Sequence, residues 1–143
     1  MAKDDRKKII IFDMDGVLFD TIPYARQAFL ETHPGVTPDM YNEIHSGNFH
    51  EGAGKYSHLR IKETAEQRNK RNLGYAEKKS KSNIFDGVRE LLTQLKREGF
   101  ILVLNTNAYD RNSFPLLENA GLNTFLTLLP PPDFQKIKLK NSD

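Results

Sequence analysis

The chain has 143 residues and a mass of 16.4 kDa, which is room for one domain, because one hydrophobic core usually organises about 100–150 residues. Its 38% hydrophobic and 28% charged residues and its net charge of +2 are typical of a globular protein and exclude a disordered or fibrous one. The absence of cysteine excludes disulfides, zinc–thiolate sites and iron–sulfur clusters. No membrane span or export signal is visible, so we expect a cytoplasmic protein without a membrane partner.

The first predicted element is a short strand. Residues 8–13 form a β-branched apolar run that ends at an aspartate and is followed by Gly16, a pattern typical of a strand buried on both faces. Residues 21–83 then contain few apolar residues and several glycines. We interpret them as an insertion with short helices over residues 23–32 and 38–45.

The second half of the insertion is basic. Residues 60–81 contain eight Lys or Arg against three Glu, which favours a solvated helix face over a surface that attracts anionic substrates. The four histidines have no zinc-binding spacing, so we expect them at the surface or at helix ends: His33, His45, His50 and His58. Possible substrate contacts in the insertion are Tyr24, Arg26 and Lys55.

Regular alternation of helix and strand resumes at residue 84. Apolar residues at helical spacing predict an amphipathic helix that Asp86 caps and Gly99 ends. Its apolar residues are Val88, Leu91, Leu92 and Leu95. Residues 100–104 predict a second strand. A helix closed by Gly121 and a third strand over residues 125–129 follow. This order implies a parallel, three-layer α/β sheet, with the carboxyl ends of its strands at one edge.

Two carboxylates follow the first strand directly. Asp13 and Asp15 can converge on a small volume if the turn brings them together, and Gly16 allows such a turn. The pair suits covalent phosphoryl transfer, in which one carboxylate attacks phosphorus and the other transfers the proton. A hard cation is implied, because two carboxylates and a phosphate repel one another unless Mg²⁺ bridges them. The alternative is an ordinary Asx turn after a strand.

The string Ile-Ile-Ile-Phe-Asp-Met-Asp-Gly-Val-Leu-Phe-Asp, residues 9–20, resembles motif I of the haloacid dehalogenase (HAD) superfamily. The resemblance implies a HAD-like (Rossmannoid) α/β fold in which Asp13 is the nucleophile and Asp15 the general acid/base. It also implies that Asp13 and the backbone carbonyl of Asp15 bind Mg²⁺. An acid at Asp15 is typical of the phosphatases and phosphomutases of the superfamily. A small phosphorylated metabolite is therefore the expected partner, and nucleic acid is not.

The second strand also has a counterpart in the family. Leu102-Val103-Leu104-Asn105-Thr106-Asn107 resembles motif II, in which the hydroxyl and a neighbouring N–H hold a phosphate oxygen. The resemblance assigns phosphate binding to Thr106, Asn107 and Gly16. It also makes residues 21–83 a helical cap, like that of the phosphoglycolate-phosphatase-like and β-phosphoglucomutase-like members. Residues 1–20 and 84–143 would then form the core.

The C-terminal part departs from the family pattern. No acidic motif IV follows Thr106, so the core reads as incomplete at its C-terminus. A motif III lysine could come only from Lys136, Lys138 or Lys140, where a solvated charge run is the favoured interpretation. Residues 125–132 can be encoded by bases that, read in a shifted frame, give the family's usual strand at this place. This suggests a frameshift near Phe125, so that the family pattern runs from about Lys7 to Phe125.

The departure leaves two alternatives to a working phosphatase. One is a catalytically impaired remnant or interaction module, in which residues 9–12 form an exposed hydrophobic edge. The other is a phosphomutase, which would differ in the lifetime of its aspartyl-phosphate. The sequence does not determine the oligomeric state or the substrate.

Overall fold

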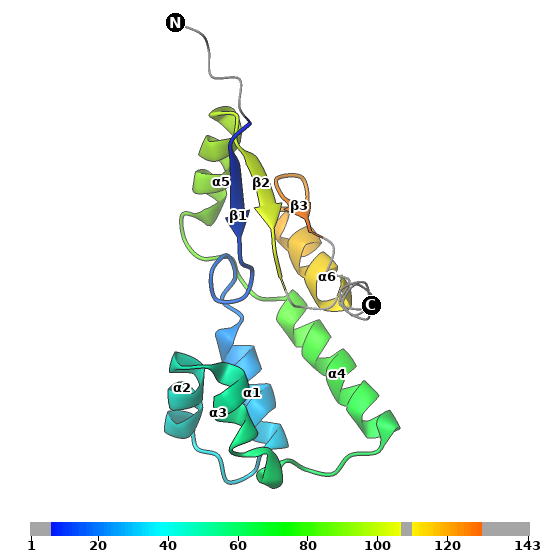
Figure 1. The fold of residues 1–143 in the computed structure, drawn as a ribbon. Coiled ribbons are helices and arrows are strands. Elements are labelled where there is room, and N and C mark those ends of the chain that lie inside the picture. The colour runs from blue at the N-terminus through cyan, green and yellow to red at the C-terminus, as the bar shows by residue number, and fades with distance from the viewer. Residues whose placement is uncertain (1–6, 107–109, 130–143) are drawn as a thin grey trace, which may run out of the picture.

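The computed structural model describes residues 7–106 and 110–129. Its elements are, in chain order, β1 (Ile9–Phe12), α1 (Ile22–Thr32), α2 (Pro38–Ser46), α3 (Phe49–Gly54), the 3-10 helix η1 (Ser57–Leu59), α4 (Ala65–Ser80), α5 (Val88–Arg97), β2 (Ile101–Leu104), α6 (Asp110–Ala120) and β3 (Thr127–Leu128). The strands and the helices α5 and α6 form one part of the molecule. Helices α1 to α4 extend from the carboxyl end of β1 (Figure 1).

The three strands form the predicted parallel sheet, in the order β1-β2-β3. Ile9 pairs with Ile101 and Phe12 with Leu104, so β1 and β2 end at the same edge. Since both strands run in the same direction, the residues that follow Phe12 and Leu104 leave the sheet side by side. Asn105 donates its N–H to the Phe12 carbonyl at 2.9 Å, which extends this pairing one residue further.

The core lies on one face of the sheet. Leu102 and Leu104 of β2 are fully buried, with Ile10 and Phe12 of β1 packed against the same cluster. The helices contribute to this cluster the apolar residues Val88 and Leu92 of α5 and Leu116 and Leu117 of α6. Because side chains alternate along a strand, one face of the sheet therefore carries both helices.

The opposite face of β1 corrects one prediction. Ile9 is 58% and Ile11 60% exposed, so the strand is not buried on both faces. It lies at the edge of the sheet, and the second helical layer that a three-layer arrangement needs is not among the described residues. The alternative expectation, an exposed hydrophobic edge at residues 9–12, agrees with these exposures.

The helical segment contains more structure than the sequence indicated. Helices α1 and α2 begin and end close to the predicted bounds, whereas α3 and η1 were not predicted. Helix α4 begins at a capping box in which Thr64 accepts the N–H of Gln67 and the Gln67 side chain accepts the N–H of Thr64. This reciprocal cap explains why the helix starts at Ala65, inside the basic segment rather than at its beginning.

Two predictions for α5 are wrong. Its N-cap is Gly87, with a φ of 82° and no side-chain cap, so Asp86 does not cap the helix. Leu91 is 45% exposed although it has the spacing of a core residue, because α5 packs against the core through Val88, Leu92 and Leu95 instead. Gly99 ends the helix as predicted, with its N–H donated to the Lys96 carbonyl.

The two chain segments that join the sheet to the helices lie beside each other. Phe19, fully buried, forms an antiparallel bridge with Ile84. Asp20 donates its N–H to Asn83 at 2.9 Å and Phe85 donates to Leu18 at 3.1 Å. One of these paired segments connects β1 to α1, and the other connects α4 to α5. Their pairing fixes where the helical segment meets the carboxyl edge of the sheet.

Candidate active site

A cavity of about 600 Å³ opens where the carboxyl edge of the sheet meets the helical segment. From the sheet side it is lined by Asp13, Asp15, Thr106 and Asn112. From the helical side it is lined by Thr21, Ile22, Ala25, Tyr41, His45, Phe49, Tyr75 and Lys79. The structure thus brings three sequence-predicted residues, Asp13, Asp15 and Thr106, into one cavity.

Asp13 is the first residue after β1 and begins a tight turn. Its Oδ1 accepts the N–H of Met14 at 2.8 Å, while the Met14 carbonyl accepts the N–H groups of Leu18 and Phe19. Met14 itself is fully buried and anchors the turn in the core. The Asp13 carboxylate is exposed to the cavity, as a nucleophile that must reach a substrate requires.

Gly16 shapes the same turn. Its φ of 71° lies in the left-handed region, which side chains disfavour. Its N–H is donated to the Phe19 carbonyl at 2.9 Å, and it does not line the cavity. The structure therefore places Gly16 in the turn that orients Asp13 and Asp15, and its N–H already has a partner other than a phosphate.

Asp15 is held by two donors from the helical segment. Lys79 Nζ lies 2.7 Å from Oδ1 of Asp15, and the Thr21 hydroxyl donates to the same oxygen at 2.7 Å. The Lys79 side chain is only 3% exposed and Thr21 is 1% exposed, whereas the Asp15 side chain is 34% exposed. Both contacts use Oδ1 of Asp15, and about a third of its side chain is exposed where it lines the cavity.

Lys79 lies in the last turn of α4, one turn after Tyr75. Its ammonium lies 5.9 Å from the centre of the Tyr75 ring, within the range of a cation–π contact. Burial, together with the charge of Asp15, raises the pKa of Tyr75 to about 12. Burial also raises the pKa of Tyr41, against the opposing effect of Arg26. Both phenols therefore stay protonated at neutral pH and present hydroxyl donors.

Of the two phosphate-binding residues that the resemblance to motif II assigns, the structure describes Thr106. Thr106, half-buried, lines the cavity after the end of β2, as predicted. Asn107 lies outside the described residues. Near the start of α6, Asn112 lines the cavity, and its Oδ1 is buried without a hydrogen-bond partner in the structure. That oxygen is an acceptor which sequence reasoning did not single out.

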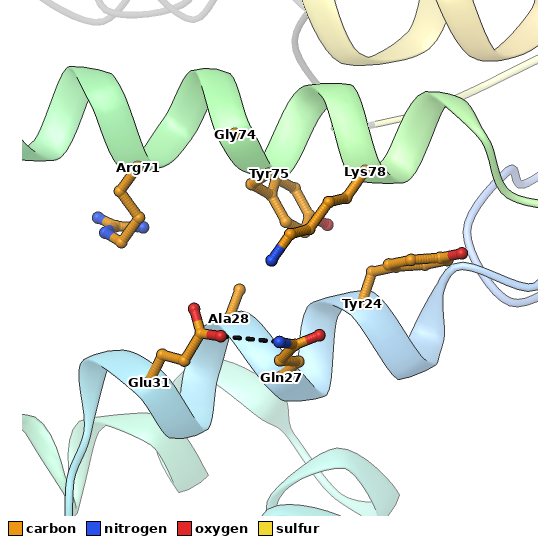
Figure 2. A pocket seen from close by; sticks show the side chains of 8 residues that line it. All are labelled: Tyr24, Gln27, Ala28, Glu31, Arg71, Gly74, Tyr75 and Lys78. Atoms are coloured by element: carbon orange, nitrogen blue, oxygen red, sulfur yellow. Dashed lines mark hydrogen bonds between the residues drawn. The ribbon is translucent and has the colours of Figure 1, made fainter.

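The other candidate substrate contacts do not reach the carboxylates. Tyr24 lines a separate cavity of about 180 Å³ between α1 and α4, together with Arg71 and Lys78 (Figure 2). In Figure 2, Lys78 points from α4 toward α1, where Gln27 donates to Glu31 at 2.8 Å. Arg26 and Lys55 are exposed and line neither cavity.

The histidines are placed partly as expected. His33 caps the end of α1, but it is buried and stacks on Phe29 with ring centres 4.1 Å apart. His50 and His58 are exposed. His45, in the last turn of α2, lines the active-site cavity, which the spacing of the histidines gave no reason to predict.

Oxygen donors in the cavity fit a hard cation. Among residues 7–106 and 110–129, no three His, Asp or Glu side chains cluster as a metal site. The lining includes the Asp13 carboxylate and Asn112, whose Oδ1 is buried without a hydrogen-bond partner in the structure. Mg²⁺ often binds through one or two carboxylates and otherwise keeps water and substrate phosphate as ligands. This donor set therefore fits Mg²⁺.

Sequence reasoning missed the residues that α2, α3 and α4 contribute. Lys79 was counted as one of eight basic residues on a solvated face, yet it is buried. One signal was available, because Tyr75 and Lys79 are four residues apart and so share a helix face. That spacing marks a possible pair, but only the packing of α4 beside the turn after β1 brings the pair to Asp15.

Residues 7–129 match the family model of haloacid dehalogenase-like hydrolases, past the predicted limit at Phe125. A curated phosphoglycolate phosphatase from Mesorhizobium japonicum is 25% identical over 142 residues, which cover 89% of this chain and 61% of that protein. The chain thus spans about three fifths of the length of this relative. None of the helices in the described part has the length and apolar character needed to cross a lipid bilayer.

Solved structures resemble the fold. A protein from Thermotoga maritima assigned as a β-phosphoglucomutase is 27% identical, with a TM-score of 0.57, and the match covers 85% of this chain and 59% of that one. A predicted phosphoglycolate phosphatase from Haemophilus somnus is 20% identical, with a TM-score of 0.61, covering 97% and 73%. With Asp13 and Asp15 in the turn after β1 and Thr106 after β2, the chain belongs to the haloacid dehalogenase-like hydrolase family.

Proposed function

We propose that this chain hydrolyses small phosphate monoesters through an aspartyl-phosphate on Asp13. The observation that carries the proposal is the arrangement of Asp15, whose Oδ1 is fixed by Lys79 and Thr21 while about a third of its side chain is exposed in the cavity that Asp13 also lines. A carboxyl group held in this way can exchange a proton without changing its position. Membership of a hydrolase family that includes a phosphoglycolate phosphatase relative supports the same chemistry.

In the first step, a carboxylate oxygen of Asp13 attacks phosphorus and the ester P–O bond breaks. The leaving oxygen takes a proton from Oδ2 of Asp15, so the alcohol departs neutral. In the second step, Oδ2 of Asp15 accepts a proton from water, which attacks phosphorus, and the bond from phosphorus to Asp13 breaks. Inorganic phosphate leaves, Asp13 is restored as a carboxylate, and Asp15 is restored as the protonated acid that began the cycle.

Two further groups serve the transferring phosphoryl. The Thr106 hydroxyl, at the cavity end of β2, is placed to donate to a phosphate oxygen, and Asn107 beside it is proposed to help. Mg²⁺ held by the Asp13 carboxylate and the Asp15 carbonyl would offset the negative charge that two carboxylates and a phosphate bring together. We further propose that the chain acts in the cytoplasm, which supplies both Mg²⁺ and phosphorylated metabolites.

The test is release of inorganic phosphate from an alkyl phosphate in the presence of Mg²⁺. We expect Asp13→Asn to lower kcat by about three orders of magnitude or more, as removal of a nucleophile does. Asp20→Asn is the matched control, because Asp20 is an exposed carboxylate on the same segment that does not line the cavity. Equal activity in the wild-type and Asp13→Asn chains would contradict the proposal, and so would a wild-type chain that folds but releases no phosphate.

A phosphomutase is the second candidate, favoured by the 27% identity to the Thermotoga maritima protein assigned as a β-phosphoglucomutase. A mutase returns the phosphoryl group from Asp13 to another hydroxyl of the same sugar. Phosphorus NMR separates the two outcomes, because hydrolysis yields inorganic phosphate and transfer yields an isomeric sugar phosphate.

A further inference from the structure

The wall of the active-site cavity opposite the carboxylates is built of rings. Among the residues that line the cavity from the helical segment, four carry rings: Tyr41, His45, Phe49 and Tyr75. The two polar groups nearest to the sheet, Thr21 and Lys79, already contact Asp15. A substrate whose phosphate lies at Asp13 would therefore present the remainder of its body to aromatic side chains.

Phe49 and His45 are exposed, Tyr75 is half-buried and Tyr41 is buried. Phe49 is 38% exposed, although other rings pack around it. Its ring centre lies 6.3 Å from that of Tyr41 and 6.2 Å from that of His45, with interplanar angles of 72° and 73°. Each of these edge-to-face contacts covers only part of the Phe49 ring, so ring surface remains for contact with another aromatic group.

A second cavity continues from the same rings. It measures about 380 Å³, lies inside the helical segment and shares Ala25, Tyr41, Phe49 and Tyr75 with the active-site cavity. The active-site cavity alone, at about 600 Å³, falls in the range of about 300–1,000 Å³ that binds drug-sized ligands. The two cavities have room for a substrate whose organic part is much larger than a two-carbon acid.

We propose that the phosphate monoester this chain hydrolyses carries a planar aromatic ring, which binds against Phe49 and Tyr75. The proposal rests on the proposed function, because the phosphate end of the substrate is placed by Asp13 and Thr106. It names a substrate class, aryl- or heteroaryl-bearing phosphate monoesters, that the phosphoglycolate of the curated relative does not belong to.

Apolar atoms make up the larger part of the cavity's exposed lining, with Ile22 and Ala25 beside the rings. This favours an aromatic group over a sugar, for which the hydroxyls of Tyr41 and Tyr75 and the His45 imidazole are the hydrogen-bonding groups of the wall.

The test compares two ligands that differ only in aromaticity, benzyl phosphate and cyclohexylmethyl phosphate. Binding is measured by titration calorimetry on the Asp13→Asn chain, which cannot form an aspartyl-phosphate, with inorganic phosphate as the reference ligand. We expect benzyl phosphate to bind about 3- to 10-fold more tightly than cyclohexylmethyl phosphate, the range of an aromatic pair beyond its buried area.

Two leucine variants in the same background assign this preference to the wall. Phe49→Leu removes the ring but keeps an apolar side chain, and it should abolish the difference between the two ligands while leaving the affinity for inorganic phosphate unchanged. Phe85→Leu is the matched control, because Phe85 is also 38% exposed but lines neither cavity. It should keep the full preference.

The outcomes separate this proposal from the proposed function. If inorganic phosphate binds and the two organic phosphates bind equally, the aromatic substrate class is wrong and the phosphatase stands. The same conclusion follows if Phe49→Leu keeps the preference. If the folded chain binds none of the three ligands, both proposals fall, because the phosphate site itself is then absent.

Discussion

Lys79 and Asp15 form an ion pair of 2.7 Å between the last turn of α4 and the turn that follows β1. The ammonium is almost completely buried, whereas about a third of the Asp15 side chain is exposed. The pair is therefore asymmetric. Water can solvate the Asp15 carboxylate if Lys79 is removed, but it has little access to the Lys79 ammonium if Asp15 is removed. The pair is also a direct side-chain link between the helical segment and the turn that carries Asp13.

This asymmetry predicts unequal losses of stability. Asp15→Ala leaves a buried ammonium without its counter-charge and should lower the free energy of unfolding by about 3 kcal/mol. Lys79→Met leaves a carboxylate that water reaches and should cost about 1–2 kcal/mol. Urea unfolding followed by circular dichroism measures both losses.

A surface pair on the same helix supplies the control. Lys81 and Glu77 lie 3.5 Å apart with side chains 70% and 74% exposed, so Lys81→Met should change stability by less than about 0.5 kcal/mol. Equal losses for Asp15→Ala and Lys79→Met would show that burial of the ammonium does not control the pair.

The Thr21 hydroxyl should matter to both stability and catalysis. Thr21→Val keeps the shape of the side chain but removes the 2.7 Å hydrogen bond to Asp15, and should cost about 1–2 kcal/mol of unfolding free energy. Because Oδ1 then loses one of its two donors, kcat should fall more than KM rises. Thr21→Ser retains the hydroxyl and should recover most of kcat; a serine variant as slow as the valine variant would show that the methyl group, not the hydrogen bond, is what matters.

Two glycines should respond to alanine in opposite directions. At Gly16 the φ of 71° is strained for any side chain, and an added Cβ would lie 3.0 Å from Ile22. We expect Gly16→Ala to destabilise the chain by about 1–2 kcal/mol. At Gly54 no atom lies within 4 Å of the added Cβ and φ is not positive, so Gly54→Ala should stabilise it by about 0.5 kcal/mol. Thermal unfolding compares them, and a neutral Gly16→Ala would mean that the turn can relax.

The pKa of Tyr75, raised to about 12 by burial and by the charge of Asp15, predicts a loss of stability at high pH. Below pH 10 the phenol is protonated in both states, so its contribution is fully present. Between about pH 10 and 12 the unfolded chain releases the proton while the folded chain retains it, and stability falls as the pH rises. Unfolding by urea at pH 9 and 11.5 should show a smaller loss in Tyr75→Phe than in the wild type. The same loss in both chains would contradict the raised pKa.

The sequence by itself determined the parallel sheet and half of the site. Apolar runs at residues 9–12 and 101–104 predict paired parallel strands, and the acidic turn after one and the hydroxyl after the other then meet at one edge. The place of Asp13, Asp15 and Thr106 follows from the direction of the strands, and their roles follow from the resemblance to the HAD motifs, without knowledge of how the helices pack.

Only the tertiary structure decided what faces these residues. Lys79 and Tyr75 belong to a helix whose sequence is polar and basic, and their burial depends on where α4 lies, which no local pattern encodes. The exposure of Ile9 and Ile11 likewise depends on which elements pack against β1, not on its apolar composition. Local propensities fix elements and their ends, but the partner of a side chain is fixed by contacts between segments distant in sequence, and the site chemistry depends on those contacts.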